Sequence, residues 1–206
     1  MAGPSEAPVR VVPSPRLRPV VRRVPDAIRA HPPRGRASLL SRFARQAVLA
    51  SAEQSGLDFF SLDALKKSDA GVPRPVRGWH WSLSHKTEFV AGVVAPVPVG
   101  IDLELSGPRH PGLFDKVADA AEWELLGGRT WPLFFRLWTA KEAVLKARGA
   151  GLSGLGDCRL LSAAEDRMEL AAGGRRWSVA SVEREPLVLA LTAGDANVAW
   201  TFQDDV

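Results

Sequence analysis

The sequence predicts an α+β fold in which helices pack against a mostly antiparallel sheet. Apolar residues recur at helical spacing around positions 38–50, 114–126 and 133–148. Residues 79–84 instead alternate between apolar and polar side chains, which is the two-residue period of a strand. The C-terminal third contains further short apolar runs separated by glycine-containing turns, and this pattern is typical of hairpins.

The first 36 residues contain half of the 16 prolines and show little apolar periodicity. We expect residues 1–8 to be disordered. Residues 9–12 and 19–24 are predicted to form strands, and we expect edge strands because proline removes hydrogen-bond donors from a sheet.

A helix is predicted to begin at Ser38 and to end near Gly56. Its apolar face consists of Leu39, Leu40, Phe43, Ala47, Val48 and Ala50. A second, short helix is predicted over residues 61–67 with Ser61 as its N-cap. Residues 69–78 are rich in proline and glycine and are predicted to form a loop.

Three strands are predicted next, over residues 79–84, 89–95 and 99–105. Pro96 and Pro98 interrupt the chain before the third strand. We therefore place a boundary here, with an N-terminal lobe over residues 1–97 and a C-terminal lobe over residues 98–206.

Two helices are predicted in the C-terminal lobe, from Phe114 to Gly127-Gly128 and over residues 133–148 before Gly149. Further strands are predicted at residues 168–170, 177–182, 187–192 and 198–202, with turns at Gly173-Gly174 and Gly194-Asp195.

The composition excludes several classes of protein. The 206 residues are 46% hydrophobic and 24% charged, unlike a disordered or collagen-like chain. The single cysteine, Cys158, cannot form an internal disulfide, and no run approaches the roughly 18 apolar residues of a membrane helix. We expect a cytoplasmic protein without a secretory signal.

Charge is distributed unevenly along the chain. Residues 1–50 contain ten arginines and two acidic residues, so they carry about +8, whereas the remainder carries about −4. A basic end of this kind indicates an anionic partner.

The most informative strand contains Gly100-Ile101-Asp102-Leu103-Glu104. Because side chains two residues apart share a face, Asp102 and Glu104 point one way and the apolar residues the other. Paired carboxylates repel unless a cation lies between them, and such ligands suit Mg²⁺ shared with substrate phosphates. The alternative is an exposed acidic strand face.

Two other patterns carry candidate chemistry. Trp138, Glu142 and Lys146 are spaced four residues apart, so one helix face offers a third carboxylate and an ammonium; the alternative is a solvated Glu–Lys pair. Ser84 and His85 end a strand, where a histidine binds phosphate or exchanges protons; the alternative is a hydrogen-bonded turn histidine.

Together and in this order, the patterns resemble the 4′-phosphopantetheinyl transferase superfamily, in particular its longer, single-chain type that activates peptide and polyketide synthetases. The strings that carry the resemblance are S-L-S-H, G-I-D-L-E and W-T-A-K-E-A-V-L-K. The resemblance runs from about Ser38 to the C-terminus and is firmest at residues 81–104 and 134–152.

The resemblance implies a fold of two similar lobes in a pseudo-twofold arrangement, with coenzyme A (CoA) between them. Such enzymes use Mg²⁺ to move the phosphopantetheine arm of CoA to a serine of an acyl or peptidyl carrier protein, releasing 3′,5′-ADP. The implied metal ligands are Asp102, Glu104 and Glu142. The implied catalytic residues are Glu142, Lys146 and His85, where Glu142 helps to deprotonate the serine and Lys146 neutralises the departing phosphate. The implied CoA-binding residues are Arg36, Arg74, Ser84, His85, Lys141 and Lys146.

Some positions depart from the family pattern. The family often has G-K-P or G-R-P before the histidine strand, whereas this chain has Gly71-Val72-Pro73-Arg74, so Arg74 would substitute. Arg36 matches only loosely.

The expected partners are CoA and an acidic carrier protein, with no membrane or nucleic acid, and we expect a monomer. The competing hypotheses are a metal-dependent nuclease or phosphohydrolase that uses the same carboxylates, and a catalytically inactive relative that binds CoA or nucleic acid.

Overall fold

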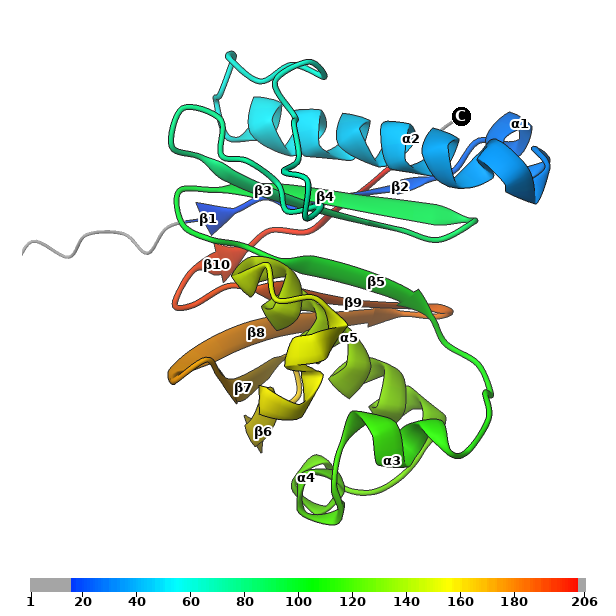
Figure 1. Cartoon of the computed structure of the whole chain (residues 1–206), viewed down its shortest axis with the longest axis vertical. Coiled ribbons are helices and arrows are strands. Elements are labelled where there is room, and N and C mark those ends of the chain that lie inside the picture. Colours follow the sequence, from blue (N-terminus) through cyan, green and yellow to red (C-terminus); the bar gives the residue numbers. More distant parts are fainter. Residues whose placement is uncertain (1–15, 204–206) are drawn as a thin grey trace, which may run out of the picture.

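The computed structural model describes residues 16–203 and confirms the α+β class (Figure 1). The predicted disorder at residues 1–8 and the predicted strand at residues 9–12 lie outside the described residues.

The strands within residues 16–203 form three sheets. The four-stranded sheet has the order β11 (Thr201–Gln203), β2 (Val20–Arg23), β4 (Phe89–Ala95), β3 (His80–His85). The five-stranded sheet has the order β5 (Ile101–Leu105), β9 (Leu187–Thr192), β8 (Arg175–Arg184), β7 (Arg167–Ala172), β6 (Arg159–Ala163). β1 (Arg16–Leu17) pairs with β10 (Asn197–Val198). Only the β1–β10 and β11–β2 pairs are parallel among these strands, so the sheets are mostly antiparallel, as predicted.

The two longest helices cover the outer faces of the two larger sheets. The bounds of the helices are α1 (Asp26–Arg29), α2 (Pro33–Gln54), α3 (Leu113–Val117), α4 (Ala120–Leu126), α5 (Trp131–Arg148) and the 3₁₀ helix η1 (Leu152–Asp157). Figure 1 shows α2 along the four-stranded sheet and α5 along the five-stranded sheet. None of the helices within residues 16–203 is long and apolar enough to cross a membrane.

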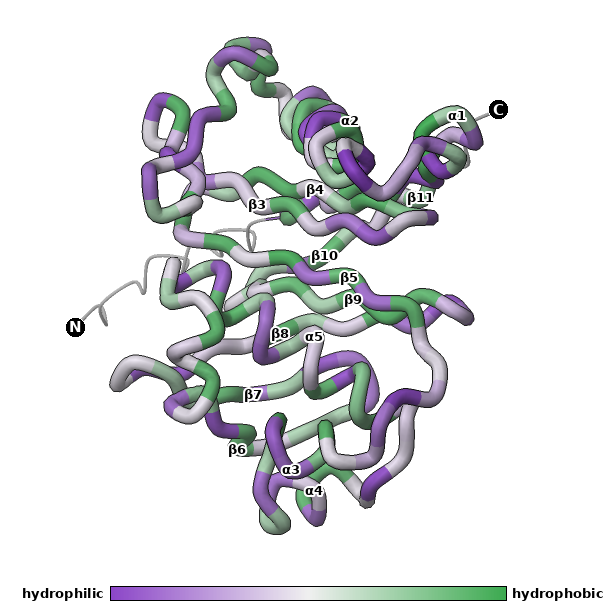
Figure 2. The backbone as a smooth tube through the Cα atoms, turned by 45° about the vertical axis from the view of Figure 1, so that its right-hand side comes forward, coloured by the Kyte–Doolittle hydropathy of each residue, from purple (hydrophilic) through white to green (hydrophobic). Residues whose placement is uncertain are grey.

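Three apolar cores hold these layers together. One lies between α2 and the four-stranded sheet, and another lies between α5 and the five-stranded sheet. The third lies between the two sheets, where Ile101 and Leu103 of β5 pack in the same cluster as Val93 of β4 and Leu191 of β9. Figure 2 shows the hydrophobic and hydrophilic residues alternating along β5. The apolar side of β5 therefore faces the sheet–sheet core, and its acidic side faces away from that core.

The N-terminal elements differ from the prediction in two ways. β2 lies between β11 and β4 and is an inner strand, not an edge strand; Pro19 precedes it and therefore removes no donor from its ladder. The helix begins at Pro33 instead of Ser38, because a proline suits the first helical turn, and Arg34 and Gly35 form a kink just after it. Its end was predicted correctly, since Gly56 follows with φ of 73°.

The segment after α2 is a correction as well. Residues 61–67 contain no helix: residues 62–64 form a turn, although the Ala64 amide does donate to Ser61 Oγ at 3.2 Å, and Lys67 forms a bridge with Pro73. The loop at residues 69–78 and the hairpin of β3 and β4 are confirmed.

The helical segment predicted from Phe114 to Leu126 consists of two helices, α3 and α4. Asp119 divides them because its side chain accepts a hydrogen bond from the Glu122 amide and caps α4. Strand β6 was not predicted, and the strand expected at residues 198–202 is divided into β10 and β11.

The lobe boundary at residues 96–98 and the pseudo-twofold arrangement stay predictions. β10 and β11, near the end of the chain, pair with β1 and β2 near its beginning.

Candidate active site

The candidate site begins where the edge strands of the two larger sheets meet. β3 and β5 are edge strands, and the Ile101 amide of β5 donates to Ser82 Oγ of β3 at 3.1 Å. Along β5, Asp102 lies opposite Ala190 and Glu104 opposite Val188 in β9. Ala190 and Val188 pack in the α5 core, so both carboxylates lie on the face that α5 covers.

A glycine allows α5 to approach β5 closely. A Cβ atom on Gly100 would lie 1.9 Å from the Ala143 carbonyl oxygen and 2.7 Å from the Ala147 nitrogen. Because a side chain cannot fit there, Gly100 lets the α5 residues Glu142 and Lys146 come beside Asp102.

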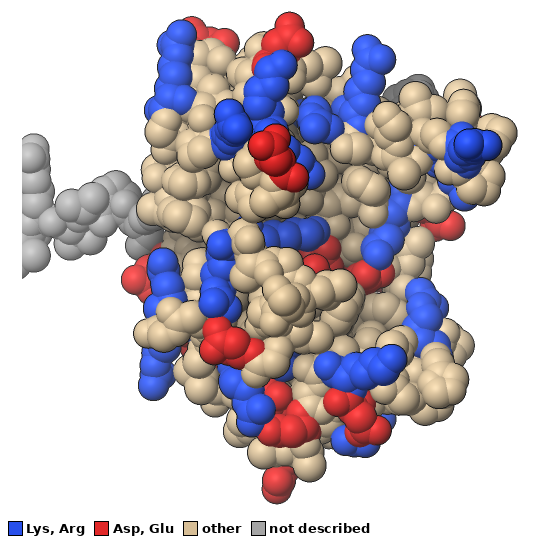
Figure 3. All heavy atoms as spheres, viewed as in Figure 1, with Lys and Arg blue, Asp and Glu red and all other residues tan. Residues whose placement is uncertain are grey.

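These residues line a pocket of about 400 Å³, which we call the charged pocket. Its lining residues are Lys67, Leu83, Ser84, His85, Lys86, Asp102, Glu104, Trp138, Glu142, Lys146 and Leu152. Figure 3 shows basic and acidic side chains meeting in the middle of this face of the molecule, between the part that contains α2 and the part that contains α5. The expected common face of Trp138, Glu142 and Lys146 is confirmed, since all three line the pocket.

Asp102 is almost completely buried, and one of its carboxylate oxygens accepts two hydrogen bonds. Lys146 Nζ donates to Asp102 Oδ1 at 2.7 Å and to the Ile101 carbonyl at 3.0 Å. Ser84 Oγ also donates to Asp102 Oδ1, at 2.9 Å. The other oxygen, Asp102 Oδ2, is buried and has no hydrogen-bond partner among residues 16–203.

Glu104 is held by two donors on the same oxygen. Lys86 Nζ lies 2.6 Å from Glu104 Oε1, and the indole Nε1 of Trp138 donates to it at 3.1 Å. The carboxylate is therefore oriented by one side chain from the β3–β4 connection and one from α5.

Glu142 sits in a different electrostatic environment. Its Oε1 is buried and lacks a hydrogen-bond partner within the described part of the chain. Burial, followed by the nearby charge of Asp102, raises the pKa of Glu142 above its usual value. Burial and the positive charges of Lys146 and Lys67 lower the pKa of His85.

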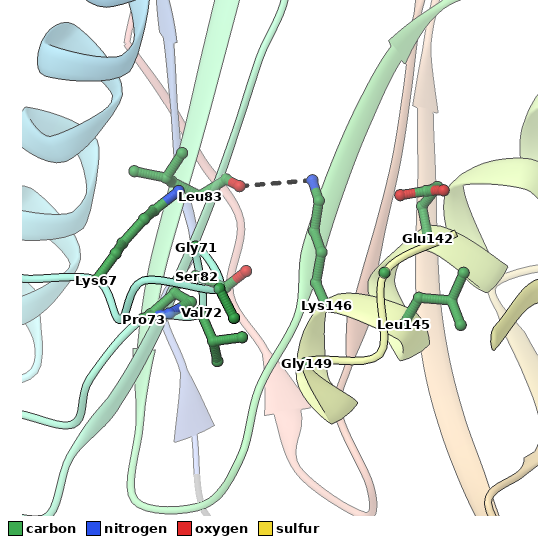
Figure 4. A pocket seen from close by; sticks show the side chains of 12 residues that line it. Lys67, Gly71, Val72, Pro73, Ser82, Leu83, Glu142, Leu145, Lys146 and Gly149 are labelled. Carbon is green, nitrogen blue, oxygen red and sulfur yellow. Dashed lines mark hydrogen bonds between the residues drawn. The ribbon is translucent and has the colours of Figure 1, made fainter. Parts of the chain in front are cut away.

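A second cavity of about 250 Å³ shares Lys67, Leu83, Glu142 and Lys146 with the charged pocket. Figure 4 shows Lys67 approaching it from the side opposite Lys146, with the Gly71–Pro73 loop and β3 between them. Burial and the charges of Arg45 and Lys146 lower the pKa of Lys67.

Sequence reasoning missed Lys67. The only signal was a lysine just before a Pro/Gly-rich loop, and the bridge that pairs Lys67 with Pro73 became visible only in the fold.

Three predicted CoA-binding residues lie apart from the charged pocket. Lys141 is buried, and its ammonium donates to Glu122 Oε1 and to the Val117 carbonyl, each at 2.7 Å. Adjacent helical residues point about 100° apart, so Lys141 points away from the pocket that Glu142 lines. Arg36 donates to the Arg29 carbonyl near the start of α2. Arg74 is exposed, and its carbonyl accepts from the Trp81 indole. The structure does bring together Ser84, His85, Asp102, Glu104, Glu142 and Lys146.

Within residues 16–203, no group of three or more His, Cys, Asp or Glu side chains stands arranged to hold a metal ion. The carboxylates of Asp102 and Glu104 are each paired with a lysine instead.

Comparison with known proteins finds relatives of the part of the chain that contains β5 and α5. Residues 98–199, which include β5 and α5, match the model of the 4′-phosphopantetheinyl transferase superfamily. The chain is 36% identical over 86 residues to the 4′-phosphopantetheinyl transferase psf-1 of Bacillus pumilus, covering 40% of this chain and 37% of that protein. It is 30% identical over 78 residues to 4′-phosphopantetheinyl transferase ffp of Bacillus subtilis, and this match covers 36% of this chain and 35% of that protein. It is also 30% identical over 91 residues to 4′-phosphopantetheinyl transferase gsp of Aneurinibacillus migulanus, a match that covers 42% of this chain and 38% of that protein. These matches span less than two-fifths of each relative. The match over β5 and α5 and these relatives support the assignment of the chain to the 4′-phosphopantetheinyl transferase superfamily.

Proposed function

We propose that this protein transfers the 4′-phosphopantetheine group of CoA to a serine of an acyl or peptidyl carrier protein, releasing 3′,5′-ADP. One observation carries the proposal: a single pocket gathers carboxylates from β5 and α5 with ammonium groups from α5 and the connecting segments. Phosphoryl transfer asks a protein mainly for positioning and charge neutralisation, and these side chains supply both.

The donor set suits Mg²⁺. Asp102 Oδ2 and Glu142 Oε1 are both buried without hydrogen-bond partners among the described residues, and a buried carboxylate oxygen in that state is costly. We propose Asp102, Glu104 and Glu142 as the ligands, because a cation between them satisfies the open oxygens and relieves their repulsion. When bound, the ion neutralises charge on the CoA pyrophosphate.

Lysines and His85 provide the site for the CoA phosphates in this proposal. Lys146 borders both cavities, and we assign its ammonium to neutralising charge on the 3′,5′-ADP leaving group. Lys67 and His85 lie on the wall opposite α5, and we assign them, with Ser84, to contacts with the remaining phosphates. Lys67 replaces Lys141, whose ammonium is buried against Glu122.

Glu142 is the proposed base. Its carboxylate lines both cavities, so we assign it to the place where the CoA phosphates and the incoming serine would meet. It takes the serine proton directly or through a water while the serine oxygen forms a bond to the β-phosphorus of CoA. The bond from that phosphorus to 3′,5′-ADP breaks at the same time, and the charge left on 3′,5′-ADP faces Lys146.

The proposed protein partner is an acidic carrier. The charge of about +8 over residues 1–50 supports this assignment, because opposite charges accelerate encounter. We propose that the enzyme acts as a monomer.

The test is to incubate the protein with CoA, Mg²⁺ and an apo carrier protein, and to measure the intact mass of the carrier and the release of 3′,5′-ADP. A carrier heavier by one phosphopantetheine, with an equal amount of 3′,5′-ADP, is the expected result. CoA binding without transfer would instead indicate an inactive relative. Nucleic-acid cleavage without any mass gain would indicate the nuclease hypothesis.

A further inference from the structure

Lys86 is a charged residue of the pocket that none of the proposed steps uses. It directly follows β3, and its backbone amide donates to the Phe89 carbonyl at 2.8 Å, which fixes the start of its side chain. Its ammonium lies 2.6 Å from Glu104 Oε1; the Lys86 side chain is 36% exposed and the Glu104 side chain 15%. The pair therefore lies at the mouth of the pocket.

The pairing leaves an uneven charge balance in the cluster. Lys86 holds Glu104 and Lys146 holds Asp102, so two of the three carboxylates already have a cation within hydrogen-bond distance. Only Glu142 has none at such a distance among the described residues, and its buried Oε1 is open. A divalent ion that entered between the carboxylates would meet the positive charge of Lys86 on Glu104.

Lys86 is one of two donors that orient Glu104, so the carboxylate does not depend on it alone. The Trp138 indole donates to the same oxygen at 3.1 Å, so the carboxylate keeps one fixed donor if the lysine leaves. Lys86 also lines a neighbouring cavity of about 470 Å³ together with Glu104, Trp138 and Lys116, so there is space beside its side chain outside the charged pocket. A half-exposed lysine on a flexible stem can turn away from Glu104 into solvent at low cost.

We infer that Lys86 is a resident counter-cation of Glu104 that the metal ion must displace, so that it lowers the metal affinity of the site and stabilises the carboxylate cluster without metal. This inference rests on the proposed metal site. Lys86 acts through Glu104 and is therefore a positioning residue.

The inference predicts two effects of opposite sign for Lys86→Met. Removing a unit charge a few ångströms from a divalent ion should tighten metal binding by about tenfold. Without metal, the same change leaves Glu104 beside Asp102 and Glu142 with one cation fewer, so the melting temperature in chelator should fall. A lysine that served only as structural support would, when removed, weaken metal binding along with stability.

The experiment uses the full chain without CoA and measures Mn²⁺ binding from the free-Mn²⁺ electron paramagnetic resonance signal. The variants are Lys86→Met, Lys86→Arg, Lys116→Met and Asp102→Asn. Lys116 is the matched control, since it is an exposed lysine that lines the same neighbouring cavity. Lys86→Arg and Lys116→Met should bind Mn²⁺ within about twofold of the unchanged protein, while Lys86→Met binds about tenfold more tightly.

The outcomes separate the inference from the function on which it rests. Equal or weaker Mn²⁺ binding by Lys86→Met, with binding still lost in Asp102→Asn, overturns the role of Lys86 alone. Mn²⁺ binding that survives unchanged in Asp102→Asn overturns the proposed metal site and the inference together.

Discussion

Glu142 shows how one side chain links function and stability. Its carboxylate is buried near Asp102 and Glu104, which raises its pKa above the ordinary value of 4.5. The folded state therefore binds this proton more tightly than the unfolded state does. Ionised Glu142 lowers stability above its folded pKa, and this cost disappears as the pH falls through that pKa toward 4.5.

Glu142→Gln should accordingly raise the melting temperature at pH 7 in chelator, and the gain should shrink toward zero near pH 4.5. Glutamine carries no charge, so it mimics the protonated acid. Differential scanning fluorimetry across this pH range checks the prediction. Glu124→Gln, at an exposed position on α4, is the control and should show no such trend. A lower melting temperature for Glu142→Gln at pH 7 would contradict the account.

His85 offers a test that reports on the bound phosphates. Burial and the charges of Lys146 and Lys67 place its pKa below 6.5, so the free protein holds it neutral at pH 7. A CoA phosphate beside the ring adds negative charge and should raise that pKa. Titration of the ring protons by NMR, with and without CoA, measures the difference, and His85→Gln assigns the signal. An identical pKa in both states would remove His85 from the CoA site.

At the scale of elements, the position of α5 is set by its contact with Gly100. Gly100→Ala places a methyl carbon 1.9 Å from the Ala143 carbonyl oxygen, and neither backbone can yield locally. We expect a loss of about 3 kcal/mol or more in the free energy of unfolding, together with lower activity, because Glu142 and Lys146 move away from Asp102. Urea denaturation measures the loss. The control is Gly156→Ala, whose added Cβ meets nothing within 4 Å and should change little.

The buried pair of Lys141 and Glu122 joins α5 to α4. Their side chains are only 2% and 4% exposed, so Lys141→Met leaves a buried carboxylate without its cation and should cost about 3–5 kcal/mol. Adding Glu122→Gln should recover part of this loss, because the buried carboxylate charge that Lys141→Met leaves without a cation is then absent. CoA affinity measured by calorimetry on the folded protein should stay unchanged. A selective loss of CoA affinity would instead return Lys141 to the binding site.

The elements also show which structural information the sequence carries. β3, β4, β9 and α5 were predicted because their periodicity is clear and glycine or proline marks their ends. β6 has a mixed burial pattern at the edge of its sheet, so no strand period identifies it. The division between α3 and α4 depends on one capping side chain, Asp119, which a helical apolar pattern does not reveal.

The same limit applies to the candidate site. The two-residue period of a strand predicted that Asp102 and Glu104 share a face. The four-residue spacing of helix neighbours predicted the same for Glu142 and Lys146. Lys67 and Lys86 reach the charged pocket only through the packing of β3 against β5, and no local pattern reports that contact.

At the scale of the molecule, the two larger sheets receive their helices in the same way. A Cβ atom on Gly92 of β4 would lie 2.3 Å from the Val48 nitrogen of α2, much as Gly100 meets α5. This repeated device supports the proposal of two similar lobes, with their boundary at residues 96–98 between β4 and β5. The charged pocket lies where the edges of the two sheets meet, so its carboxylates come from the C-terminal side of that boundary and its lysines from both sides.

The most direct measurement of the central claim is the rate at which an apo carrier protein gains phosphopantetheine mass with CoA and Mg²⁺. The unchanged protein and Glu124→Gln should convert the carrier at similar rates, and Asp102→Asn should be slower by orders of magnitude, because it removes a charge from the metal site without changing the size of the side chain. Excess chelator should stop conversion in every sample. Near-normal conversion by Asp102→Asn, or conversion that persists in chelator, would contradict the account.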